Sequence, residues 1–322
     1  MLSWQARLLK QYFRLRRFLA PAAGILDVQH ERATTEALAA RFAAHARVQS
    51  MPVTINGVGG EWLVPATVAP GVAPGVAPDR ILFYLHGGSY IAGSIHAYRS
   101  LVANLATAAH ARALLIEYRL APEAPFPAAL DDALAAYRGL VSNATPAQPI
   151  IVAGDSAGGG LALALLVAAR DQGTPLPAAA VCLSPWTDLA ATGASWVTNA
   201  KADLLNDGDK LRQAARLYLG TYAPDTPLAS PLYADLHGLP PLLLQVGTDE
   251  ILLTDATRLA ARAQAAGVPV TLEIWPGMQH EWHFAANWLP ESRQAIARIG
   301  EFIEICCAAA KATETTTRQA AR

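Results

Sequence analysis

A glycine-rich run, VAGDSAGGG, joins an apolar strand-like stretch at residues 149–153 to an apolar helix-forming stretch at residues 161–170. Within it, Ser156 has a glycine two residues away on either side, which is the pattern G-x-S-x-G. Small neighbours allow a sharp turn between a strand and a helix, which lifts the serine hydroxyl above the end of the strand. The backbone N–H of Ala157 would then lie at the helix N-terminus, where it can stabilise a negative oxygen. An ordinary Gly-rich turn before a buried helix has the same local pattern, so the rest of the chain must decide between the two.

Strand-like and helical stretches alternate on both sides of this run. The expected strands are near-continuous apolar runs at residues 81–85, 113–118, 149–153, 179–183, 242–246 and 270–275. The expected helices cover residues 100–109, 131–140, 161–170, 255–266 and 291–306. Apolar strands that alternate with helices indicate an α/β fold, with a mostly parallel sheet covered by helices on both faces.

Two segments without this alternation are expected to form a helical cap over one edge of the sheet. Residues 1–48 have the pattern of two helices, and residues 186–239 include a helical piece at 207–219 but no clear strand. Insertions of that length between strands are usually functional. The core would then consist of residues 49–185 and 240–307.

Two stretches are expected to lie outside the core packing. A V-A-P-G repeat at residues 68–78 follows two short strand-like stretches, 52–55 and 61–65. Its prolines cannot donate ladder hydrogen bonds and the repeat is too short for a solenoid, so we expect an exposed connection. Residues 308–322 are polar and poor in aromatic side chains, which predicts a flexible tail.

Composition excludes several classes of function. A net charge of −1 gives no basic surface for nucleic acid. The three cysteines, Cys182, Cys306 and Cys307, match neither a disulfide framework nor a zinc spacing, which favours a cytoplasmic protein without a metal site. No segment is long and apolar enough to be expected to span a bilayer. Residues 1–17 mix apolar and basic side chains in a helical pattern that could lie on a membrane surface, but we expect them to pack on the protein itself.

A nucleophilic serine requires a base, and the histidines that follow the last expected strand are the candidates. His280 and His283 are three residues apart, whereas the H-E-x-x-H pattern of zinc peptidases places its histidines four apart on one helix face. A metal site is therefore not expected here. His280 lies nearer the end of the strand and is the predicted base; His283 is expected to be a packing or surface residue.

The base in turn requires an acid, and two adjacent carboxylates follow the strand at residues 242–246. Asp249 lies between Ser156 and His280 in the chain, which is the order expected for this type of site. We predict that its carboxylate holds the imidazole of His280. Glu250 is the competitor for this role.

Consecutive glycines follow the strand at residues 81–85 and predict donors for a negatively charged oxygen. Without a Cβ atom, the amides of Gly87 and Gly88 can turn inward. Together with Ala157 they are the predicted oxyanion donors, and the amide of Ser89 could replace one of them.

In content and order, these stretches resemble the bacterial hormone-sensitive-lipase-like (family IV) carboxylesterases, which have the α/β-hydrolase fold. The matching stretches are HGG at 86–88, YRLAPE at 118–123, FPAA at 126–129, GDSAGG at 154–159, SPWTD at 184–188, DE at 249–250 and GMQH at 277–280. The resemblance implies a cofactor-free serine esterase with a triad of Ser156, Asp249 and His280. It also implies an oxyanion hole made by three amides, those of Gly87, Gly88 and Ala157.

The resemblance leaves the substrate open. It implies short- to medium-chain acyl esters, and the SPWTD and GMQH stretches are similar to members that hydrolyse acetyl esters or monoterpene-type lactones. An amidase or peptidase on the same fold is the nearest alternative, and a non-catalytic ligand-binding receptor is a third. Members often dimerise through the last strand and helix, so a homodimer is open as well. Ser89 replaces the third glycine of the usual H-G-G-G and must tolerate its backbone conformation.

Overall fold

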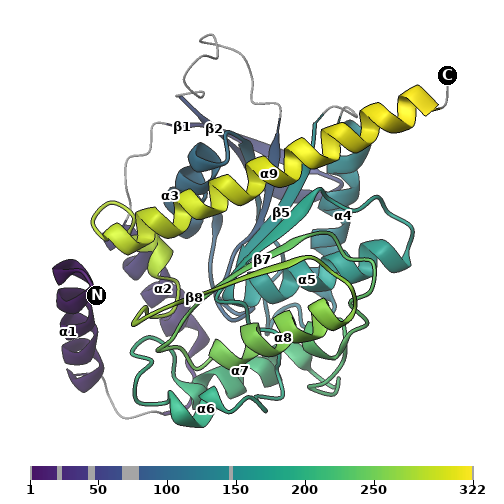
Figure 1. Cartoon of the computed structure of the whole chain (residues 1–322). Helices are drawn as coiled ribbons and strands as arrows, with labels where there is room; N and C mark the ends of the chain where they lie inside the picture. Colours follow the sequence, from purple (N-terminus) through teal and green to yellow (C-terminus); the bar gives the residue numbers. More distant parts are fainter. Residues whose placement is uncertain (1, 20–23, 43–47, 67–79, 145–147, 321–322) are drawn as a thin grey trace.

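A twisted sheet of eight strands forms the centre of the computed structural model, which describes the chain apart from residues 1, 20–23, 43–47, 67–79, 145–147 and 321–322 (Figure 1). The strand order is β1-β2-β4-β3-β5-β6-β7-β8. The strands are β1 (Val48–Ile55), β2 (Val58–Pro65), β3 (Ile81–Leu85), β4 (Arg112–Ile116), β5 (Ile150–Asp155), β6 (Ala179–Leu183), β7 (Leu242–Gly247) and β8 (Val270–Trp275). All pairings from β4 to β8 are parallel, and β1 and β2 join one edge antiparallel.

Helices connect these strands. They are α1 (Trp4–Leu19), α2 (Val28–Phe42), α3 (Ile95–Ala108), α4 (Ala128–Asn143), α5 (Ser156–Asp171), α6 (Ser195–Thr198), α7 (Gly208–Leu219), α8 (Leu253–Ala265) and α9 (Pro290–Ala320), with short 3-10 turns η1 (Pro231–Tyr233) and η2 (Trp282–Ala285). The predicted alternation of strands and helices is thus confirmed.

Both faces of the sheet are buried at its centre. Successive side chains of a strand point to opposite faces, and in β3 Phe83 packs into the cluster that includes α4, α5, α7 and α8. Its neighbours Leu82 and Tyr84 pack into the cluster with α3 and α9. Because the central strands β3 and β5 are entirely buried, their apolar runs show no polar alternation, as the sequence pattern predicts.

The register of the central strands brings the chain segments of interest to one edge. Leu85 pairs with Gly154, and Asp155 pairs with Leu183, so the residues after β3, β5 and β6 emerge next to one another. The parallel strands β7 and β8 end at the same edge. Chemistry-bearing side chains that are distant in sequence therefore meet there.

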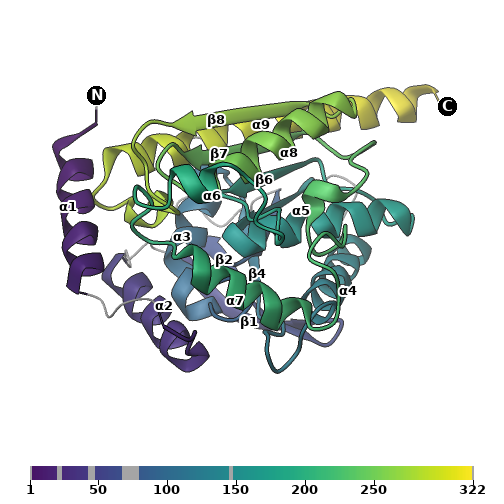
Figure 2. The same ribbon diagram turned by 90° about the horizontal axis from the view of Figure 1, so that it is seen from below.

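The remaining segments cover this edge. Figure 2 shows α1 and α2 at one side of the molecule and α7 in front of the sheet, and residues of all three helices line one cavity. The division into core and cap remains a prediction. The chain from residue 308 continues α9 as a helix to Ala320, where a flexible tail is expected from the sequence. The V-A-P-G repeat lies outside the described residues.

Candidate active site

Ser156 occupies the turn between β5 and α5 and has a φ of 50°. This left-handed conformation is uncommon for a residue with a side chain and is typical of functional turns. The flanking glycines make the turn possible. A Cβ at Gly154 would lie 2.3 Å from the carbonyl oxygen of Gly158, and a Cβ at Gly158 would lie 2.1 Å from that of Leu85. The strand–turn–helix context predicted for G-x-S-x-G is thus present.

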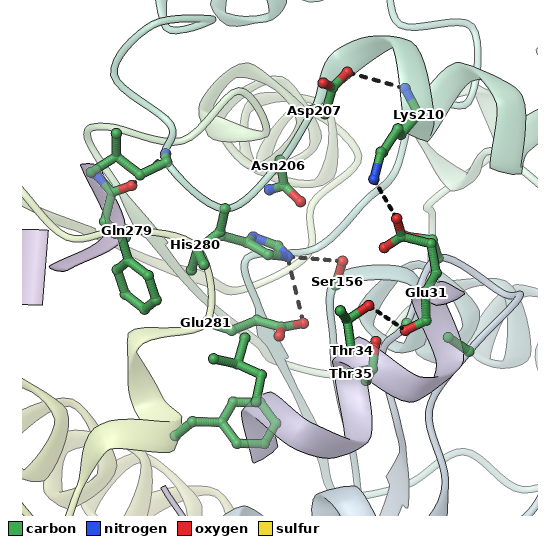
Figure 3. A pocket seen from close by; sticks show the side chains of 18 of the residues that line it. Glu31, Thr34, Thr35, Ser156, Asn206, Asp207, Lys210, Gln279, His280 and Glu281 are labelled. Carbon is green, nitrogen blue, oxygen red and sulfur yellow. Dashed lines mark hydrogen bonds and ion pairs between the residues drawn. The ribbon is translucent and has the colours of Figure 1, made fainter. Parts of the chain in front are cut away.

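A line of hydrogen bonds runs from Ser156 through His280 to Glu250. His280 Nε2 lies 3.0 Å from Ser156 Oγ, and its Nδ1 lies 2.8 Å from Glu250 Oε2 (Figure 3 shows the serine end). The other carboxylate oxygen of Glu250 accepts hydrogen bonds from the Ser184 hydroxyl at 2.8 Å and from the Gly247 amide at 2.5 Å. A nucleophile, a base and an orienting acid therefore meet in hydrogen-bonding geometry.

The predicted contact between Asp249 and His280 is wrong. Asp249 Oδ2 forms an ion pair of 2.6 Å with Lys10 of α1 and accepts a hydrogen bond from Gln279. Glu250, one residue further around the turn, is completely buried beneath the loop and reaches the imidazole instead. Both carboxylates follow the same strand, so position along the chain does not separate them. The signal in the sequence is that Glu250 directly precedes the apolar run ILL, which indicates burial.

Burial and neighbouring charges set the pKa values of Glu250 and His280. Burial raises the pKa of Glu250, opposed by its hydrogen bond to His280. For His280, burial alone would lower the pKa, but the negative charges of Glu281 and Glu250 outweigh burial and raise the pKa well above its ordinary value. The imidazolium that forms when His280 accepts a proton is therefore strongly stabilised.

A second pair of carboxyl groups, Asp155 and Glu281, adjoins the imidazole, a feature the sequence analysis missed. Asp155 Oδ1 accepts hydrogen bonds from the Tyr84 hydroxyl at 2.6 Å and the Gly87 amide at 3.1 Å. Glu281 Oε1 lies 3.5 Å from His280 Nε2. Burial and the charge of Glu281 raise the pKa of Asp155 well above its ordinary value. Burial would also raise the pKa of Glu281, but the His280 charge outweighs it and lowers that pKa to about 2. Glu281 therefore presents a negative charge to the base.

The loop after β3 presents different amides from those predicted. The Gly87 amide donates to Asp155 and is not available to a substrate, which contradicts its predicted role. Gly88 and Ser89 line the cavity beside Ser156, with φ values of 108° and 56°. Ser89 thus adopts the left-handed conformation that glycine would favour. We therefore propose the amides of Gly88, Ser89 and Ala157 as the donors to a reacting oxygen.

The cavity above Ser156 has a volume of about 780 Å³. One wall is apolar and includes Leu9 and Phe13 of α1 and Phe42 of α2. The lining also includes an ion pair of 2.5 Å between Glu31 of α2 and Lys210 of α7 (Figure 3). This volume lies within the range of sites that bury a drug-sized ligand.

His283 has no access to the reacting groups. It is buried, and its Nε2 lies 2.8 Å from Gln245 Oε1. Burial lowers the pKa of His283 to about 3, so it stays neutral at physiological pH. Among the described residues, His, Cys, Asp and Glu side chains form no group of three or more with the arrangement of a metal site. In that same part of the chain, every helix is too short or too polar to cross a bilayer.

Comparison with known proteins agrees with this geometry. Residues 82–284 match the family model described as alpha/beta hydrolase fold. The chain is 50% identical over 251 residues to an acetyl-hydrolase of Streptomyces hygroscopicus, covering 78% of this chain and 81% of that protein. It is 35% identical over 272 residues to an esterase of Acinetobacter venetianus, covering 84% and 87%. A crystal structure of an esterase from the bacterial hormone-sensitive lipase family superposes with a TM-score of 0.87 at 44% identity, covering 95% and 99%. The chain therefore belongs to the bacterial hormone-sensitive-lipase family of esterases on the α/β-hydrolase fold.

Proposed function

We propose that this carboxylesterase cleaves short- to medium-chain acyl esters through an acyl-enzyme on Ser156, with His280 as base and Glu250 as the acid that orients it. The observation that carries the proposal is the hydrogen-bonded line from Ser156 Oγ through both imidazole nitrogens to Glu250. Glu250 accepts from Nδ1–H, which leaves the lone pair of Nε2 directed at the serine hydroxyl.

Acylation begins when His280 Nε2 takes the proton of Ser156 as Oγ attacks the carbonyl carbon of the ester. The π electrons of the carbonyl move onto its oxygen, and the amides of Gly88, Ser89 and Ala157 stabilise that charge. As the tetrahedral intermediate collapses, the bond to the alkoxy oxygen breaks. The alcohol leaves with the proton that His280 held.

Deacylation repeats these steps with water. His280 takes a proton from the water, whose oxygen attacks the acyl carbon, and the bond to Ser156 Oγ breaks as His280 returns the proton. A lactone follows the same reaction steps. Its alcohol stays attached to the acyl group after acylation and leaves with it during deacylation.

The cavity favours acyl groups of limited length. Apolar side chains of α1 and α2 form part of the lining, and the Glu31–Lys210 ion pair in the same lining limits the apolar surface available to a long chain. Burial of each additional CH₂ stabilises binding by about 0.8 kcal/mol only where the chain meets apolar surface. The Streptomyces relative is described as an acetyl-hydrolase, and this description supports a preference for a small acyl group.

A panel of p-nitrophenyl esters from acetate to laurate, with a lactone and a matched p-nitroanilide, tests this proposal. We expect kcat/KM to be highest among the short and medium esters and to fall towards laurate. A maximum at laurate would contradict the chain-length preference. An anilide rate equal to that of the ester would favour the amidase alternative.

A further inference from the structure

The helix α1 has two apolar faces, one buried against the protein and one largely exposed. Ala6 and Phe13 are buried against the body, and Leu9 is partly buried. Another set of large side chains, 55–84% exposed, points the other way: Trp4, Leu8, Leu15, Phe18 and Leu19. At 3.6 residues per turn these five fall within a stripe of about 100° around the helix. We call this stripe the outer face of α1. Trp288, in edge-to-face contact with Trp4 at 5.9 Å, extends it.

The outer face is bordered by positive charge. The described helix contains five basic residues and no acidic one: Arg7, Lys10, Arg14, Arg16 and Arg17. Lys10 and Arg17 turn towards the body, where Lys10 pairs with Asp249 and Arg17 donates to the carbonyl of Ala200. By helical geometry, Arg7 and Arg14 border one side of the outer face and Arg16 borders the other.

We propose that the outer face of α1 docks on an anionic phospholipid surface. An exposed apolar stripe that contains tryptophan and is flanked by arginines is the pattern of a helix that lies in the plane of a membrane interface. The charge favours this occupant over a second copy of the chain, because two such faces would bring arginines against arginines. Each arginine near an anionic surface contributes attraction that salt weakens.

Docking would place lipid beside the entrance of the active-site cavity. The face of α1 opposite the stripe supplies Ala6, Leu9 and Phe13 to the cavity wall. In both views α1 lies at the periphery of the molecule, with the sheet on one side only (Figures 1 and 2). An ester dissolved in the bilayer could then reach Ser156 by passing around this one helix.

Co-sedimentation of the full chain with phospholipid vesicles tests the proposal. We expect binding to vesicles of phosphatidylcholine with phosphatidylglycerol at low salt, weaker binding at high salt, and little binding to phosphatidylcholine alone. The double variant Arg7→Gln/Arg14→Gln should bind roughly thirtyfold more weakly, since each arginine contributes about 1 kcal/mol at such a surface. Leu15→Glu should also weaken binding, whereas the matched control Val197→Glu, on another exposed apolar residue, should not.

Activity on soluble p-nitrophenyl acetate shows that the variants fold, because none of the substituted residues lines the cavity. The proposal is overturned if the wild type does not bind the anionic vesicles at low salt, or if it binds and the α1 variants bind equally well. Sedimentation velocity tests whether the outer face of α1 forms a dimer instead. A dimer that Leu15→Glu dissociates, with vesicle binding unchanged in every variant, would also overturn the proposal.

Discussion

Glu250 and Asp249 are adjacent carboxylates in different surroundings. Glu250 is buried with three hydrogen-bond partners, among them His280, and Asp249 is paired with Lys10 in the middle of α1. We expect Glu250→Gln to lower kcat by about 10⁴, as in other triads where the acid is replaced by its amide, because the imidazole loses its orienting partner. The matched variant Asp249→Asn should keep kcat within about tenfold of wild type. A large loss of kcat in Asp249→Asn together with a small loss in Glu250→Gln would show that Asp249 is the acid.

The charge of Glu281 should control the pH dependence of the reaction. Catalysis requires neutral His280, so kcat/KM rises as the pH increases through the raised pKa of this imidazole. The titratable groups that interact with it are Glu250, Asp155, Glu281 and His283, of which Glu250 and Glu281 carry the negative charge that raises its pKa. Glu281→Gln removes one of these charges and should shift the acid limb of kcat/KM to lower pH.

The control for this shift is Glu301→Gln, at an exposed carboxylate on α9 that is distant in sequence from the site. It should leave the pH profile unchanged. An acid limb that stays in place in Glu281→Gln, or moves to higher pH, would show that Glu281 does not stabilise the imidazolium.

At the scale of elements, the turn between β5 and α5 depends on the absence of side chains. A Cβ at Gly158 would lie 2.1 Å from the carbonyl oxygen of Leu85 and 2.3 Å from that of His86. Gly158→Ala should therefore lower the free energy of unfolding by about 2–3 kcal/mol, the usual cost of overpacking, and should displace Ser156. Urea denaturation measures this loss. Gly59→Ala, whose added Cβ would meet no atom within 4 Å, is the control and should change stability by less than about 1 kcal/mol.

Strands were predictable where an apolar run marks them in the sequence. The strands β3, β6 and β8 have the bounds that their apolar runs predict. The start of α3 was missed by five residues, because Ser94 caps the helix by accepting a hydrogen bond from the Ala97 amide, a local contact outside the apolar pattern. In the site, the contact between Ser156 and His280 follows from topology. Which of two adjacent carboxylates turns inward depends on the turn after β7 and on the contact of Asp249 with Lys10 of α1. The apolar run ILL after Glu250 indicates its burial, but the contact with Lys10 joins residues 239 positions apart and has no local sequence pattern.

At the scale of the whole molecule, the N-terminal segment is joined to the loop that carries the acid and to the start of α9. Lys10 pairs with Asp249 at partly buried positions, and Ser3 donates two hydrogen bonds to Glu291 at the start of α9. A double-mutant cycle of Lys10→Ala and Asp249→Ala, followed by urea unfolding, should give a coupling energy of about 0.5–1 kcal/mol. The more exposed pair Arg212–Asp209 should give less. Equal coupling energies would show that α1 is not held through Asp249.

The most direct test of the assignment of Ser156, His280 and Glu250 is the rate at which a fluorophosphonate labels the serine, read by mass spectrometry of the labelled peptide. We expect a single adduct on Ser156 in the wild type and in Asp249→Asn, at similar rates. Labelling should be strongly slowed in Glu250→Gln and absent in Ser156→Ala. Labelling of another residue, or an unchanged rate in Glu250→Gln, would contradict the assignment.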